Sequence, residues 1–287
     1  MNQLADLWAV LRQLAGFENG IKLLNIYKGL PISYDSTIRE VRESSLIVET
    51  SKYQAVCLYL DRFTFLQSHH FVAPVQASLQ SIDVINLQVC LDELHYVNEG
   101  IGDRQQVRVE PAEMMLVQIH FPGSRTPIDA ELANISQAGL GIYLANHVFS
   151  YKNHAPKTEV LIELPFSPSS APGYLNTRSL IPQTDPLARF SREQLRGTAS
   201  LGDRGRPAGG RPPGSTRSLS PRGRFMVRGV ILNIKSDYQR QRMRLGLQIF
   251  PDEDARAAIG NFISQRQSEI IREIKMMYDL IVKLDRK

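Results

Sequence analysis

The N-terminal residues repeat apolar side chains at the spacing of a helix. The apolar positions are Leu4, Leu7, Trp8, Leu11, Leu14 and Ala15. This period predicts an amphipathic helix that ends at Gly16 or Gly20. Because its polar positions hold few basic residues, we interpret the helix as packed on its own domain and not on a membrane surface.

Short apolar runs without helical spacing follow this helix. They are rich in Val, Ile, Leu, Tyr and Phe and lie at residues 22–28, 46–50, 55–60, 72–79 and 87–91. Gly29-Leu30-Pro31 and Ser33–Ser36 supply residues typical of turns. Strands this close together, with no helical pattern between them, predict an antiparallel sheet or a small barrel.

A second series of predicted strands begins after a glycine-containing stretch at 99–103. These strands lie at residues 114–121, 128–135, 141–144, 159–164, 225–234 and 245–250. The series is interrupted at 167–223, which is rich in Pro, Gly, Ser and Arg. Such a composition buries too little apolar surface to offset chain entropy, so we predict a disordered insertion within the second domain.

The tail repeats apolar residues at near-heptad spacing. The repeated residues are Ile259, Ile263, Ile270, Ile274, Met277, Ile281 and Leu284. Acidic residues at 252–254 favour the start of a helix. We expect this helix to pack on its own domain; a second copy of the chain is the alternative partner, although only about three heptads are present.

Together these patterns predict a mainly β protein with a terminal helix at each end. The predicted organisation is two small antiparallel β-barrel domains in tandem: 1–98 with the leading helix, a linker at 99–103, a barrel at 104–252 that carries the insertion, and a helix at 253–287. With no secretory signal and no apolar run long enough to span a membrane, we expect a cytoplasmic protein. Cys57 and Cys90 lie in apolar runs and are expected to be buried, reduced thiols.

The net charge of +5 is concentrated in one segment of the chain. Residues 167–224 hold ten arginines, no lysine and three acidic residues, so the remainder is close to neutral. The basic average therefore does not indicate that the folded part binds nucleic acid.

Motifs typical of catalysis and of metal binding are missing from the sequence. It holds no Walker-type phosphate loop, no Cys-x-x-Cys pair, no His-Glu-x-x-His helix and no Gly-x-Ser-x-Gly elbow. The pair His69-His70 has no acid or Cys at metal-ligand spacing, and we interpret it as a solvated loop. We therefore expect a protein that is not an enzyme and that has no metal or cofactor.

Two motifs in the second half stand out as a pair. Arg104-Gln-Gln-Val-Arg108 precedes the second strand series, and Asn134-Ile-Ser136-Gln-Ala-Gly139 follows 26 residues after its second arginine. In their order, separation and setting, these motifs resemble the signature of the PilZ family of cyclic di-GMP receptors, Arg-x-x-x-Arg followed by Asp/Asn-x-Ser-x-x-Gly. The resemblance covers roughly 104–250 without the insertion, and the order of the two domains resembles YcgR-like PilZ proteins.

The chemistry of these residues suits a cyclic dinucleotide. Arginine contacts phosphate oxygens and the guanine edge as a planar fork, and residues four apart in an extended segment span at most about 13–14 Å. Asn134 and Ser136 are two apart in a strand and so point to one face. Gly139 permits a tight turn and close backbone approach. By resemblance, Arg104, Arg108, Asn134, Ser136 and Gly139 would hold cyclic di-GMP. Taken singly, these residues could equally be solvated linker charges and turn residues.

The resemblance implies a receptor that changes domain arrangement on binding ligand. Its output would pass to a protein partner in flagellar motility, adhesion or polysaccharide export. One departure from the family is Asp103, where members often carry another Arg, so affinity or stoichiometry could differ.

Two other classes of function stay open at this point. The Arg/Gly-rich segment could bind nucleic acid through counterion release, with the barrel as a scaffold, and deletion of 170–222 would separate that activity from dinucleotide binding. Alternatively, the chain could be a structural scaffold that forms a dimer through its C-terminal helix.

Overall fold

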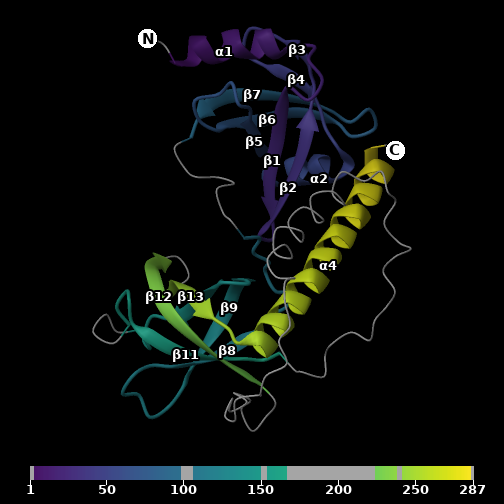
Figure 1. The fold of residues 1–287 in the computed structure, drawn as a ribbon. Coiled ribbons are helices and arrows are strands. Elements are labelled where there is room, and N and C mark those ends of the chain that lie inside the picture. Colours follow the sequence, from purple (N-terminus) through teal and green to yellow (C-terminus); the bar gives the residue numbers. More distant parts are fainter. Residues whose placement is uncertain (1–2, 98–105, 150–153, 167–223, 238–240, 286–287) are drawn as a thin grey trace, which may run out of the picture.

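The chain folds into two β-structures joined by one long helix in the computed structural model (Figure 1). The structure describes residues 3–97, 106–149, 154–166, 224–237 and 241–285. The predicted linker at 99–103 and the predicted insertion at 167–223 lie outside these residues. No helix within the described ranges is long and apolar enough to cross a membrane.

The N-terminal part is a seven-stranded antiparallel sheet with the order β2-β1-β5-β6-β7-β4-β3. Its elements are α1 (Gln3–Leu14), β1 (Ile21–Tyr27), β2 (Leu30–Ser36), β3 (Ile38–Val41), β4 (Leu46–Glu49), α2 (Lys52–Asp61), β5 (Phe63–Gln67), β6 (Val75–Asp83) and β7 (Gln88–Tyr96). Helix α1 packs Leu7, Leu11 and Leu14 into the core of this sheet, as predicted. The sheet is curled but stays open, with β2 and β3 at its edges, so it forms half of the barrel that the sequence predicts here.

Two predictions for the N-terminal part are wrong. The run at 55–60 was expected to be a strand, but it belongs to α2, which begins after an N-cap at Ser51 whose hydroxyl accepts a hydrogen bond from the Gln54 amide. This helix is buried along its centre, so its apolar residues form a continuous run that mimics a buried strand. The turn residues at 33–36 instead form β2, because the β1–β2 turn is confined to Lys28 and Gly29, both with positive φ.

The C-terminal part is a closed six-stranded barrel with the order β10-β13-β12-β11-β8-β9. Its strands are β8 (Leu116–His120), β9 (Ile128–Ser136), β10 (Gly139–Ala145), β11 (Glu159–Leu164), β12 (Phe225–Asp237) and β13 (Arg242–Phe250). All neighbouring strands pair antiparallel. This confirms the barrel predicted from the second strand series.

Helix α4 (Glu253–Asp285) connects the two parts of the molecule. It leaves the barrel directly after β13 and runs beside α2 (Figure 1). One apolar cluster includes its residues Ile259 and Ile274, barrel residues such as Ile135, and Val56 and Cys57 of α2. The near-heptad residues are therefore mostly buried within the chain. They pack against both the barrel and the N-terminal part, and not against their own domain alone as expected.

Candidate ligand-binding site

A β-bulge in β9 decides which way the motif residues point. The register between β9 and β10 shifts so that Gly141 pairs with Asn134 while Ile142 pairs with Leu132, which leaves Ala133 without a partner in the ladder. Such an extra residue reverses the alternation of side chains beyond it. Leu132 and Ile135 consequently both point into the core. Asn134 and Ser136, on either side of Ile135, point the opposite way, to the outer face, where both are covered and only 6% and 3% exposed.

The segment after Arg108 pairs with this bulged end of β9. Val109 and Ile135 exchange both backbone hydrogen bonds, at 2.9 and 3.0 Å. In an antiparallel ladder such residues lie directly opposite each other, and so their side chains share one face, here the core. The neighbouring residues Arg108 and Ser136 are therefore opposed on the outer face. The strand pairing thus brings the second arginine of the first motif onto the second motif.

Arg108, Ser136 and Gly139 meet at the β9–β10 turn. The Arg108 Nη2 atom lies 3.8 Å from the position that a Cβ on Gly139 would occupy, and the Ser136 Oγ lies 3.5 Å from it. The Ser136 hydroxyl donates a hydrogen bond to the Gly139 carbonyl at 3.2 Å. A side chain at position 139 would also lie 3.1 Å from the Leu247 carbonyl. Glycine therefore keeps this surface flat beneath the guanidinium group.

Asn134 lies one step along the same face, over a second glycine. Its Oδ1 atom is 2.7 Å from the position of a Cβ on Gly141, its partner in the β9–β10 ladder. That oxygen is buried and accepts no hydrogen bond from the described residues. Asn134 therefore presents an unpaired polar group beside the Arg108–Ser136 cluster.

The same pairing of asparagine and glycine recurs on the next two strands. Gly141 pairs with Gly246 of β13, which pairs with Asn233 of β12. The Asn233 Oδ1 atom is 2.6 Å from the position of a Cβ on Gly246. Two neighbouring glycines, on β10 and β13, are therefore flanked by an asparagine on β9 and another on β12.

Gln106 is a site residue that the sequence analysis missed. Its Oε1 atom accepts a hydrogen bond from the Ala138 amide at 2.9 Å, which fastens the Arg-x-x-x-Arg segment to the β9–β10 turn. A glutamine between two motif arginines carries no recognisable signal. Its role becomes visible only once the segment is seen lying across the turn.

The described structure holds four of the five predicted site residues. Arg108, Ser136 and Gly139 lie together, with Asn134 beside them on the same face; Arg104 lies outside the described residues. A cavity of about 470 Å³ lies elsewhere on the barrel surface, lined by residues such as His120, Leu161, Arg228 and Phe250. Within the described ranges, no group of His, Cys, Asp and Glu is arranged to hold a metal ion.

Comparisons with known proteins give similarity in structure only. The sequence matches no protein-family model, and a comparison with curated proteins finds no significant match. Among solved structures, the chain is similar to K. pneumonia MrkH in complex with c-di-GMP, at 12% identity over 99% of this chain and 94% of that chain, with a TM-score of 0.34. It is similar to Escherichia coli YcgR in complex with c-di-GMP, at 13% identity over 96% and 95%, with a TM-score of 0.35.

A third similar structure is the Bacillus subtilis inhibitor of motility MotI/DgrA, at 11% identity over 87% of this chain and 96% of that chain, with a TM-score of 0.34. Because identities and TM-scores are low, the fold assignment rests on the strand order and register described above. The structure shows a closed six-stranded barrel in which Val109 pairs with Ile135 and Arg108 lies at the β9–β10 turn.

Proposed function

We propose that this protein is a non-catalytic receptor for cyclic di-GMP, bound by Arg104, Arg108, Asn134, Ser136 and Gly139. The observation that carries the proposal is the position of the Arg108 guanidinium group over Gly139 and beside Ser136. Two sequence motifs that are weak when taken separately thereby form one surface. That surface combines a guanidinium group with a hydroxyl and an amide, which can hydrogen-bond phosphate oxygens and guanine edges.

The chemistry of the cluster fits a guanine nucleotide with phosphates. The guanidinium group of Arg108 can donate two parallel hydrogen bonds to phosphate oxygens or to the O6 and N7 atoms of guanine. The unpaired Oδ1 of Asn134 can accept from the N–H groups of guanine if the side chain turns toward the ligand. Satisfying a buried acceptor removes a cost of about 1–3 kcal/mol.

Ligand binding would be transmitted through the strand that carries Arg108. We propose that gripping the dinucleotide changes how the N-terminal sheet is held against the barrel and so alters a surface for a protein partner. Flagellar motility, adhesion and polysaccharide export are candidate outputs, suggested by the resemblance alone. The cytoplasmic location, the partner and a dimer through the C-terminal helix stay predictions.

Isothermal titration of cyclic di-GMP into the intact protein tests this proposal. We expect saturable binding that weakens by about 10- to 100-fold in Arg108→Ala, because a charge-assisted contact contributes about 1.5–3 kcal/mol. Arg104→Ala and Ser136→Ala should also weaken binding. Arg125→Ala is the matched control, since Arg125 is exposed in the β8–β9 loop and away from the motif. Absence of binding to the folded protein, or equal effects of Arg108→Ala and Arg125→Ala, would contradict the proposal.

A further inference from the structure

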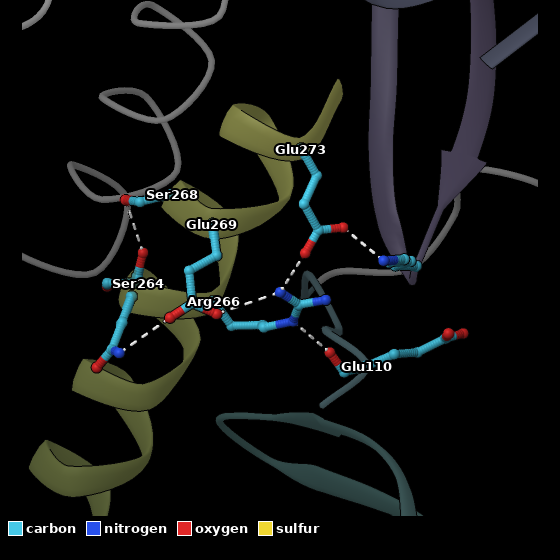
Figure 2. Close-up of polar contacts among 8 residues, drawn as sticks. Glu110, Ser264, Arg266, Ser268, Glu269 and Glu273 are labelled. Atoms are coloured by element: carbon cyan, nitrogen blue, oxygen red, sulfur yellow. Dashed lines mark hydrogen bonds and ion pairs between the residues drawn. The ribbon is translucent and has the colours of Figure 1, made fainter. Parts of the chain in front are cut away.

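The backbone of Glu110, two residues after Arg108, is hydrogen-bonded through both its N–H and its carbonyl. Its N–H donates to the carbonyl of Lys28, in the β1–β2 turn, at 3.0 Å. Its carbonyl accepts from the Nε of Arg266, on α4, at 2.8 Å. The strand that carries the motif arginine is thus fixed between the N-terminal sheet and the long helix. Figure 2 shows Arg266 reaching Glu110 from α4.

Gly29 brings the β1–β2 turn directly against the backbone of Arg108. Its φ is +81°, and a Cβ at this position would lie 2.8 Å from the Arg108 carbonyl oxygen and 3.5 Å from the Val109 Cα. A contact of 2.8 Å with backbone atoms cannot be relieved by rotating a side chain. The close approach of the turn to the ligand motif therefore depends on glycine.

Side chains close these backbone contacts into a ring. The Lys28 Nζ donates to Glu273 on α4 at 2.5 Å, and the Arg266 Nη1 donates to the other carboxylate oxygen of Glu273 at 2.8 Å. The ring runs from Lys28 to Glu273, Arg266, Glu110 and back to the Lys28 carbonyl. It joins residues of the N-terminal sheet, the helix and the entry to the barrel.

The ring is shielded from solvent at its centre. The Arg266 side chain is only 3% exposed, and Glu269 contributes a second carboxylate to it at 3.2 Å (Figure 2). Burial acts to raise the pKa of Glu273, but hydrogen bonds from Lys28 and Arg266 outweigh this and lower the pKa overall. The lowered pKa keeps Glu273 ionised near neutral pH, so the ring is charged; the Nη2 atom of Arg266 is buried and has no hydrogen-bond partner among the described residues.

We infer that Arg266 and the Lys28–Gly29 turn are positioning residues for Arg108, so that docking of the N-terminal sheet sets the affinity of the barrel site. This inference rests on the proposed function, because it concerns the same ligand site. The physical reason is that the ring holds the backbone of Glu110, two residues after Arg108, and that the Gly29 turn lies against the Arg108 carbonyl. Loosening the ring frees the strand that presents the guanidinium group. The coupling is reciprocal: if docking of the N-terminal sheet raises the affinity for ligand, then binding of ligand stabilises the docked sheet by the same factor.

The first test compares two arginine variants of α4 in the intact chain. Arg266→Met removes the hydrogen bond to Glu110, whereas Arg272→Met makes the same charge change at an exposed position of the same helix. We expect Arg266→Met to weaken cyclic di-GMP binding by about tenfold and Arg272→Met to leave it within about twofold, in the range of typical coupling between sites. Equal affinities for the two variants would overturn the inference.

The second test uses two glycines with the same backbone conformation. Gly16 has a φ of +85° and nothing within 4 Å of its Cβ position, so Gly16→Ala carries the conformational cost of Gly29→Ala without its clash. We expect Gly29→Ala to weaken binding about tenfold relative to Gly16→Ala. This variant leaves the buried ion pairs in place, so it keeps the inference testable if Arg266→Met does not fold.

A double variant separates positioning from a general structural effect. If Arg266 acts through Arg108, then Arg266→Met should cause no additional loss of affinity in an Arg108→Ala background. An additional tenfold loss there would overturn the inference. A change that merely destabilises the protein would lower the affinity whether or not Arg108 is present. A loss of affinity that occurs only when Arg108 is intact therefore indicates positioning.

Hydrogen exchange without ligand distinguishes failure of this inference from failure of the proposed function. We expect faster exchange of the Val109 and Ile135 amides in Arg266→Met and in Gly29→Ala than in their controls. Faster exchange in a protein that binds no cyclic di-GMP would refute the proposed ligand and leave the positioning contacts supported. Unchanged exchange in both variants would overturn the inference, even where the wild-type protein binds the dinucleotide.

Discussion

One extra residue in β9 determines the chemistry of the barrel's outer face. Without the bulge at Ala133, strand alternation would turn Asn134 and Ser136 into the core beside Leu132. The sequence predicts that these two polar residues share a face, because they are two apart in a strand. It does not predict which face. Before the bulge the buried apolar residues are at even positions, such as Leu132, and after it the buried apolar residue is at an odd position, Ile135. Register against β10 supplies the missing information.

Two glycine substitutions test the part played by Asn134. A Cβ at position 141 would lie 2.7 Å from the Asn134 Oδ1, so Gly141→Ala must push that side chain from its place. We expect titration calorimetry to show cyclic di-GMP binding weakened by about tenfold, as the loss of one neutral hydrogen bond implies.

Gly246→Ala is the matched control for this substitution. Its Cβ would meet the Asn233 Oδ1 at 2.6 Å, but Asn233 is exposed and can turn away. We expect an affinity within about threefold of wild type, with similar unfolding midpoints for both variants. An equal loss of affinity in both, or no loss in Gly141→Ala, would show that Asn134 does not contact the ligand.

At the scale of elements, apolar periodicity identified most strands and both terminal helices. It failed at α2, whose run of apolar residues lacks the helical period because Gln54 and the residues that follow it are buried on several sides. It also could not predict what α4 packs against. A helix covered by two different structures along its length shows the same near-heptad pattern as one that pairs with another helix.

The packing of α4 predicts very different costs for two apolar substitutions on it. Ile270 is fully buried, whereas Leu280 is 57% exposed. We expect Ile270→Ala to lower the free energy of unfolding by about 2–5 kcal/mol, because it leaves a cavity between the helix and the rest of the chain. Leu280→Ala should change it by less than about 0.5 kcal/mol. Urea unfolding followed by circular dichroism measures both.

The opposite ranking of the two variants would contradict this account of α4. A large effect of Leu280→Ala that depends on protein concentration would show instead that the helix pairs with a second copy. Sedimentation of the same variants distinguishes these outcomes. A small effect of Ile270→Ala would mean that the helix is not held against the chain.

At the scale of the whole molecule, the contacts that matter most are the ones least visible in the sequence. Lys28 and Glu273 are 245 residues apart, and Arg266 and Glu110 are 156 apart. Neither contact belongs to a motif, because an ion pair, or a hydrogen bond from a side chain to a backbone carbonyl, needs only one suitable residue on each side. The two ligand motifs were recognisable because each is a local pattern. The ring that ties them to the N-terminal sheet is a product of the tertiary fold.

Hydrogen exchange with and without cyclic di-GMP tests most directly whether the dinucleotide binds at the predicted place. We predict slower exchange on adding ligand at residues 106–110 and 134–139, where the arginine segment lies across the β9–β10 turn. Strands β11 and β12, which line the separate cavity, should be unchanged. Protection centred on those strands, or no protection at saturating cyclic di-GMP, would contradict the account.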